Sequence, residues 1–165
     1  MITKVLRELE YLANHGVEIG ILAIDKSLTG EDGKTSILEY AIYNEFGTSS
    51  IPPRPFMRNT IDTNEEYISN LIQETPNKVL KGELTGKEAL MRIGETIRGL
   101  IIQSIATAQA WAVPNDPKTL KIKTKNEQTN NTKPLLDNRF LIKSIRYQIV
   151  NKNGTIEYLS DFKDV

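Results

Sequence analysis

His15 is the single histidine of this sequence, and its side chain is the only one that ordinarily titrates near neutral pH. It precedes Gly16 at the expected end of an amphipathic helix, where a positive charge interacts favourably with the helix dipole. We therefore interpret His15 as a helix-capping or surface residue and not as a catalytic base. The sequence has no cysteine, so disulfides and thiolate metal sites are excluded.

Carboxylates are the other groups that could bind a metal or perform acid–base chemistry. Glu65 and Glu66 are adjacent in sequence and so point to different sides of a helix. Asp25, Glu31 and Asp32 share one polar loop but lack the alternating spacing of a calcium-binding loop. The chain also lacks the GxSxG, GxxxxGK(S/T) and GxGxxG motifs. We predict that the protein is not an enzyme and binds no cofactor or metal. A hydrolase whose carboxylate pair is assembled by folding is the last alternative.

The composition narrows the class of protein. A chain of 165 residues is enough for one domain, which we place at residues 1–165. Lys plus Arg and Asp plus Glu both number 21, and a net charge of zero argues against a protein that mainly grips nucleic acid. Zero net charge also favours self-association. No apolar run approaches the ~20 residues of a membrane span, and the N-terminal residues lack the pattern of a signal peptide. We expect a protein that is made in the cytoplasm and has no membrane partner.

Hydrophobic spacing, capping sequences and turn residues predict the order of secondary structure. The pairs Ser36–Glu39, Thr63–Glu66 and Thr85–Glu88 have the spacing of a capping box. Pro76 should end or kink the helix that contains it. Asn153-Gly154 is a typical two-residue hairpin turn. The predicted elements are helices at 2–13, 37–46, 57–75 and 86–108, short helices from 117 and near 135–141, and strands at 17–24, 145–149 and 155–159.

This order predicts an α+β fold in which a small antiparallel or mixed sheet packs on several helices. The longest helix carries an apolar stripe that Gly94 and Gly99 interrupt. Close packing of another backbone is the simplest reason for these glycines. The polar stretches 25–35 and 124–133 are predicted to be long mobile loops.

The stretch from Tyr40 to Arg58 organises the rest of the chain. Gly47 stands where a helix C-cap favours glycine. Three prolines follow, and each fixes its own φ and favours an extended residue before it. We therefore predict a rigid, exposed arm that places Phe56 at a fixed position. The prolines of this arm are Pro52, Pro53 and Pro55.

A second stretch, 118–146, is basic, with eight Lys and Arg residues against two acidic ones. A solvated face is the simplest interpretation, and a surface that meets an acidic partner or DNA is the alternative. A nucleic-acid-associated protein that uses this surface is therefore our second functional hypothesis. The basic residues are Lys118, Lys121, Lys123, Lys125, Lys133, Arg139, Lys143 and Arg146.

Two phrases of the sequence, YAIYNEFGTSSIPPRPFMR and KPLLDNRFLIKSIRYQIV, together resemble the tail-completion and neck proteins of tailed bacteriophages. This head–tail joining family includes minor tail protein Z and the related virion morphogenesis proteins. Asn138-Arg139 departs from the Thr-Gly that is usual there. The residues that match the first family phrase are Ala41, Glu45, Phe46, Gly47, Thr48, Ile51, Pro52, Pro53, Arg54, Pro55 and Phe56, and those that match the second are Lys133, Pro134, Leu135, Asp137, Leu141, Ser144 and Ile145.

The resemblance implies a virion structural protein at the head–tail junction or the top of the tail. Such proteins are thought to form a ring that joins the connector or head-completion protein to the tail terminator or tail tube, and DNA passes through the lumen without sequence-specific binding. On this basis we expect the segment from Glu45 to Phe56 to reach a neighbouring subunit or tail protein, with Phe56 buried as an anchor and Arg54 paired with an acidic group. The alternative is that Phe46 and Phe56 fill this chain's own core. We expect the interface to include Glu45, Phe46, Gly47, Ile51, Pro52, Pro53, Arg54, Pro55, Phe56, Arg58, Leu135, Asp137 and Arg139.

Overall fold

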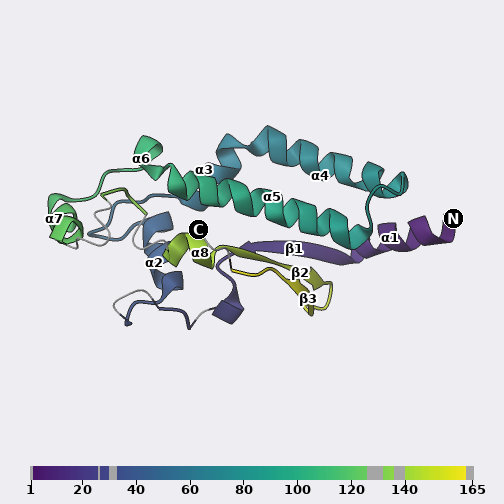
Figure 1. The fold of residues 1–165 in the computed structure, drawn as a ribbon, viewed down its shortest axis with the longest axis horizontal. Coiled ribbons are helices and arrows are strands. Elements are labelled where there is room, and N and C mark those ends of the chain that lie inside the picture. Colours follow the sequence, from purple (N-terminus) through teal and green to yellow (C-terminus); the bar gives the residue numbers. More distant parts are fainter. Residues whose placement is uncertain (1, 26, 30–32, 126–131, 136–139, 163–165) are drawn as a thin grey trace.

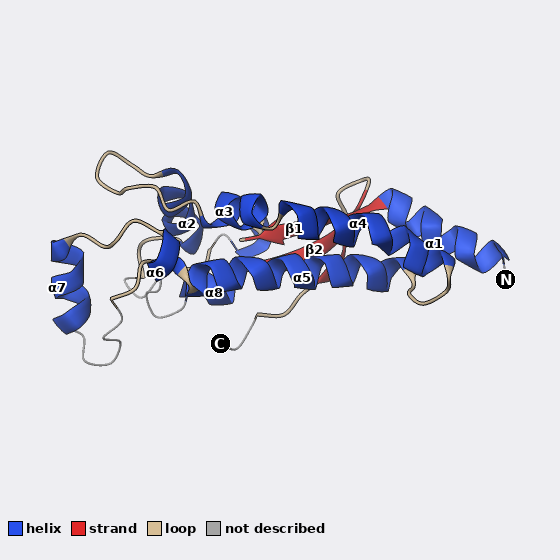
Figure 2. Ribbon diagram, turned by 90° about the horizontal axis from the view of Figure 1, so that it is seen from above, coloured by secondary structure: helices blue, strands red, loops and turns tan. Residues whose placement is uncertain are grey.

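A long helix lying over a small sheet defines the molecule in the computed structural model (Figure 1). The structure describes residues 2–25, 27–29, 33–125, 132–135 and 140–162. The long helix α5 and its neighbour α4 run along the length of the molecule, α1 extends from one end, and α7 lies at the other (Figures 1 and 2). The predicted α+β fold is confirmed.

The described residues form eight α-helices, one 3₁₀ turn (η1) and three strands. Most helices lie close to their predicted positions. In chain order the elements are α1 Ile2–Asn14, β1 His15–Gly20, η1 Ala23–Asp25, α2 Ile37–Phe46, α3 Phe56–Thr63, α4 Glu65–Leu80, α5 Gly86–Ala106, α6 Ala108–Trp111, α7 Pro117–Lys125, α8 Phe140–Ser144, β2 Arg146–Asn151 and β3 Ile156–Leu159.

The sheet is antiparallel, with β2 between β1 and β3. The predicted hairpin joins β2 to β3, but its turn spans Asn151–Gly154, where the Gly154 N–H donates to the Asn151 carbonyl (2.9 Å) and Gly154 has a φ of 78°. The predicted two-residue turn centred on Asn153-Gly154 does not form, because it requires a positive φ at Asn153 as well. The first strand was predicted at 17–24 but spans His15–Gly20. It ends early because the chain turns at Gly20 (φ 142°) into η1, which buries Asp25 against Arg146.

The core lies between α5 and the sheet, and it includes Ile97, Ile101 and Ile105 of the predicted stripe. Gly94 allows close packing, as predicted, but its neighbour is a side chain and not a backbone. A Cβ at Gly94 would collide with the ring of Tyr147 on β2. No atom of the described residues lies within 4 Å of the position that a Cβ would take at Gly99, so the prediction is wrong there.

Two of the three predicted capping boxes form, at Ser36–Glu39 and Thr85–Glu88. The third does not form, because the Thr63 hydroxyl donates a hydrogen bond of 2.6 Å to the Asn59 carbonyl and α4 begins one residue later. The helix also continues through Pro76 to Leu80, so of the two predicted effects of this proline, an end or a kink, the end does not occur. Because proline has no N–H, the carbonyl of Ile72, four residues earlier, does not receive its usual helical hydrogen bond. Ile72 is exposed, so water can donate to that carbonyl instead.

Candidate interaction surface

Glu45 and the first turn of α3 fasten the two helices of the Tyr40–Arg58 stretch together. α3 begins at Phe56 without a side-chain cap of its own. The Glu45 carboxylate, at the end of α2, accepts hydrogen bonds from the backbone N–H of Met57 (2.9 Å) and of Arg58 (3.1 Å). These N–H groups have no partner within the helix, and a negative charge is favourable at a helix N-terminus. Glu45 therefore caps α3 from 11 residues upstream of its first residue.

Arg58 returns the contact by capping the end of α2. Its guanidinium donates to the backbone carbonyl of Glu45 (2.8 Å) and to the Glu45 carboxylate (3.2 Å). It also lies over the ring of Phe46, 5.3 Å from the ring centre. Glu45 and Arg58 thus fix the angle at which α2 meets α3, and they hold Phe46 beside the junction.

Arg54 is buried and engaged within this chain. Its guanidinium donates to the carbonyls of Val113 (2.7 Å) and Pro114 (3.1 Å) and to the side-chain oxygen of Asn44 (3.3 Å). It contacts no carboxylate among the described residues, and burial lowers the pKa of Arg54. Its predicted pairing with an acidic group of a neighbour would require it to leave these carbonyls.

The two phenylalanines of the stretch have different environments. Phe56 is 2% exposed and belongs to the hydrophobic core, as the alternative interpretation proposed. Phe46 is 67% exposed and lies outside that core. Pro52 and Pro53 are also exposed, whereas Arg54 points inward. The predicted rigid arm is therefore exposed at Pro52 and Pro53, and Arg54 and Phe56 fasten it to the body of the chain.

Phe46 borders an apolar pocket of about 360 Å³ between α2 and α3. Ile42 and Tyr43, on the same helix as Phe46, are 45% and 40% exposed. Exposed apolar patches with a charged rim typically mark sites of protein association. We call this region the Phe46 groove, and it is lined by Ile21, Leu38, Ala41, Ile42, Glu45, Phe46, Phe56, Met57, Arg58 and Ile145.

The remaining predicted interface residues are distributed around this groove and beyond it. Gly47 has a φ of 75°, as its predicted role as C-cap requires, and the Thr48 N–H closes the next turn onto the Ile51 carbonyl (2.8 Å). Pro55 is half-buried, and Leu135 is 2% exposed. Asp137 and Arg139 lie outside the described residues.

The basic stretch 118–146 does not form one surface. Arg146 is buried, pairs with Asp25 (2.9 Å) and stacks on Phe162 (4.2 Å to the ring centre). Lys118 and Lys121 are exposed on α7. That helix extends to Lys125, so the loop predicted at 124–133 begins later than expected. Residues 126–131 of that loop, and 26 and 30–32 of the loop predicted at 25–35, lie outside the described residues.

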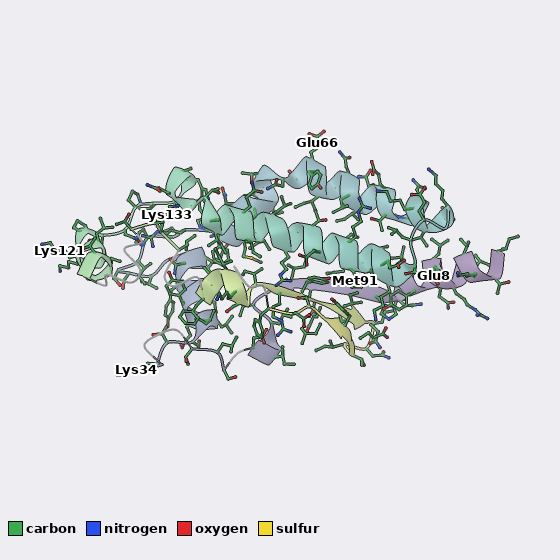
Figure 3. All side chains as sticks on the ribbon, in the orientation of Figure 1. Glu8, Lys34, Glu66, Met91, Lys121 and Lys133 are labelled. Atoms are coloured by element: carbon green, nitrogen blue, oxygen red, sulfur yellow. The ribbon has the colours of Figure 1, made fainter. Side chains whose placement is uncertain are left out.

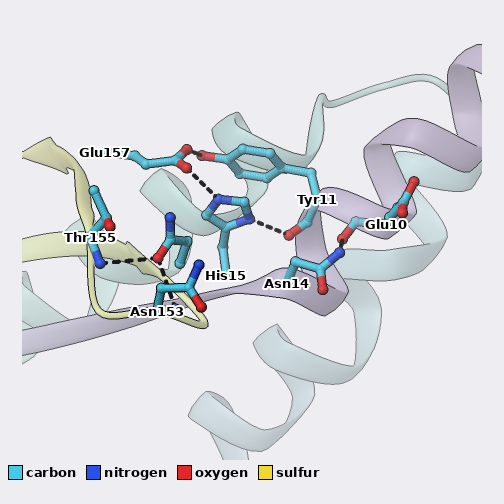
Figure 4. Close-up of polar contacts among 8 residues, drawn as sticks. Glu10, Tyr11, Asn14, His15, Asn153, Thr155 and Glu157 are labelled. Carbon is cyan, nitrogen blue, oxygen red and sulfur yellow. Dashed lines mark hydrogen bonds and ion pairs between the residues drawn. The ribbon is translucent and has the colours of Figure 1, made fainter.

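His15 caps the end of α1 but is not a surface residue. Its Nδ1 lies 2.8 Å from the Tyr11 carbonyl, and its side chain is 10% exposed (Figure 4). Its Nε2 pairs with the Glu157 carboxylate at 2.9 Å, and the imidazole stacks on the Tyr11 ring with centres 3.7 Å apart. The Tyr11 hydroxyl donates to the same carboxylate (3.0 Å). Burial lowers the pKa of His15, but the bonds to Glu157 and to the Tyr11 carbonyl outweigh it and leave that pKa raised.

Neither a metal centre nor a membrane span is present in the part of the chain that the structure describes. No three His, Asp or Glu side chains there are grouped as metal ligands would be. None of the described helices combines the length and apolar character needed to cross a membrane. Comparisons of the chain with family models, curated proteins and solved structures found no match.

Proposed function

We propose that this protein is a structural component of a tailed-phage virion that forms part of a ring at the head–tail junction. The family phrases in its sequence suggest this role. The observation that supports it best in three dimensions is the Phe46 groove, because the first phrase builds an exposed apolar patch and holds it rigidly. Glu45 and Arg58 fix the patch before any partner binds, so association needs little ordering of the chain.

In this proposal the ring joins the connector or head-completion protein to the tail terminator or tail tube, and DNA passes through it without sequence-specific contacts. Arg54 and Phe56 act indirectly by holding the patch in place from within the chain. Phe46, Ile42 and the exposed prolines make the contact with a neighbouring subunit or tail protein.

The test is deletion of the gene from the phage or prophage that encodes this chain. We expect DNA-filled heads and separate tails in the electron microscope, with joined particles restored by the wild-type gene. Phe46→Ala should restore fewer joined particles than the matched variant Ile24→Ala, which removes an apolar side chain that is 58% exposed outside the groove. Normal joined particles without the gene, and without this chain in their protein content, would contradict the proposal.

A further inference from the structure

Helix α7 is a strongly basic element at one tip of the molecule. Its nine residues, Pro117–Lys125, include four lysines and no acidic residue. Lys118 and Lys121 are exposed and form no ion pair within the described residues. Figures 2 and 3 show α7, with Lys121, standing apart from the body of the molecule, and α7 belongs to none of the closely packed pairs of elements. Lys118 and Lys121 therefore present positive charge that no described residue of the chain compensates with an ion pair.

The exposed residues of α3 and α4 have the opposite charge. Residues 59–77 include four acidic residues and no basic one. Asp62, Glu65 and Glu66 are exposed and form no ion pair among the described residues, whereas Glu74 pairs with Lys78 at 3.9 Å. Figure 3 shows Glu66 pointing away from the body. We call this region the α3–α4 acidic face.

Apolar side chains are interspersed with these carboxylates. Ile61, Tyr67 and Ile72 are 44%, 55% and 49% exposed on the same two helices. A surface of this kind offers apolar area to bury as well as charge to pair, which is what a specific protein contact needs. A lone acidic patch would be expected to remain solvated.

Figures 1 and 2 place α7 beyond the end of α5, apart from α4 in both views, so one chain does not bring the two charged regions together. We propose that α7 of one copy docks on the α3–α4 acidic face of a second copy. Because the two surfaces differ, the contact is heterologous, and its repetition gives a closed ring or an open filament. This contact deepens the proposed function, on which it rests, by assigning a second pair of surfaces, besides the Phe46 groove, through which neighbouring subunits of the ring meet.

A second copy fits α7 better than nucleic acid does. The chain has zero net charge, and the same molecule presents an acidic face that would repel a phosphate backbone. Arg146, the last basic residue of the stretch 118–146, is buried against Asp25 and so cannot contact a phosphate. The exposed lysines Lys118 and Lys121 on α7 are opposite in sign to the exposed carboxylates of α3 and α4, as a contact between two copies requires.

Charge reversal on each surface tests the contact, with self-association measured by sedimentation velocity at low salt. We expect the wild type to associate and to dissociate when salt is raised, since exposed charge pairs are screened. Lys118→Glu with Lys121→Glu, and separately Asp62→Lys with Glu66→Lys, should each weaken association by about tenfold or more because like charges then face one another. In the second variant, the new positive charge at position 62 interacts favourably with the helix dipole at the C-terminal end of α3. This gain in stability offsets the unfavourable positive charge at position 66, at the start of α4.

The decisive measurement is an equimolar mixture of the two variants. In the mixture, the reversed α7 of the first variant faces the reversed, basic face of the second, and the basic α7 of the second faces the acidic face of the first. Both contacts then join opposite charges, so mixing should restore association. Lys4→Glu with Arg7→Glu is the matched control, because it reverses two exposed cations on α1 and should associate as the wild type does. Circular dichroism of every variant confirms that the helices are intact.

Three results would overturn this contact. The first is a wild type that stays monomeric at low salt and millimolar protein concentration. The second is a mixture of the two variants that fails to associate. The third is an α7 variant that associates normally but no longer shifts a DNA duplex in a gel. The last result would assign α7 to nucleic acid. Any of them would leave the particle experiment on the proposed function unaffected. The converse outcome is that mixing restores association while the chain is absent from phage particles. That combination would support the contact and contradict the ring's role in the virion.

Discussion

The α2–α3 junction and the α1–β3 junction both join segments through a carboxylate, a cation and an aromatic ring, but they do so by different chemistry. At the first, Glu45 bonds to backbone N–H groups and the cation is an arginine, whose charge is constant. At the second, Glu157 bonds to the imidazole of His15 and the hydroxyl of Tyr11. The second junction should therefore respond to pH near neutrality, because its cation is a histidine.

The junctions also differ in what surrounds them. Phe56 is buried directly beside Glu45, and Phe46 is exposed on the same side as Arg58. The α1–β3 junction is a smaller, partly exposed contact at the other end of the sheet. Substitutions at each junction test this difference, and their expected effects on stability are given in decreasing order.

Phe56→Ala should lower the free energy of unfolding by about 3–5 kcal/mol, because it removes a ring that is 2% exposed and leaves a cavity in the core. Urea denaturation followed by circular dichroism measures this change. A loss below about 1 kcal/mol would show that the junction does not depend on this ring.

Glu45→Ala should lower the free energy of unfolding by about 1–3 kcal/mol, because two backbone N–H groups of α3 lose their acceptor in a buried setting. Hydrogen exchange should show lost protection at the amides of Met57 and Arg58. Glu45→Gln is the control, since its amide oxygen can still accept one of these bonds. Unchanged protection in the alanine variant would contradict the capping role.

Stability should fall as pH rises from about 6 to about 8, because the pKa of His15 is raised above its ordinary value of 6.5 in the folded state. The protonated imidazole contributes its stabilisation fully below the unfolded pKa and loses it as pH rises through the folded pKa. The pKa of Glu157 is lowered, chiefly by its bond to His15, so its contribution is lost in acid, as pH falls through that lowered value.

His15→Gln should remove most of the change in melting temperature between these two pH values. Glu39→Gln is a matched control, since it alters a capping carboxylate remote from the α1–β3 junction and should leave the pH dependence as it is in the wild type. An equal pH dependence in the His15 variant would assign the effect to another group.

Phe46→Ala should change the free energy of unfolding by less than about 0.5 kcal/mol, because the ring is already 67% exposed. Its stability is measured beside that of Phe56→Ala under the same conditions. A large loss would mean that Phe46 supports the junction instead of being available to a partner.

Local features were predictable from the sequence where one residue type and a short spacing determine the structure. The capping boxes at Ser36 and Thr85, the C-cap at Gly47 and the hairpin that joins β2 to β3 are examples. The failed capping box at Thr63 shows the limit, because Thr63 is the last residue of α3, where its hydroxyl donates to the Asn59 carbonyl, and Asn64 takes the position before α4.

Contacts between distant segments were harder to predict. Nothing in the spacing of Glu45 indicates that it caps a helix 11 residues downstream. Arg98 was missed although one pattern could have revealed it: it follows Leu90 and Gly94 at intervals of four, on the buried side of α5. Its guanidinium holds the carbonyls of Ile145 and Asp161, both at 2.8 Å, and so attaches the C-terminal segment to α5.

The absence of a side chain at Gly94 sets the thickness of the molecule. The ring of Tyr147 occupies the space that even a methyl group on α5 would need, so helix and sheet can approach this closely only while position 94 carries hydrogen alone. Evolution can therefore enlarge position 94 only if position 147 shrinks, and descendants of this sequence should show the two sites changing as a pair.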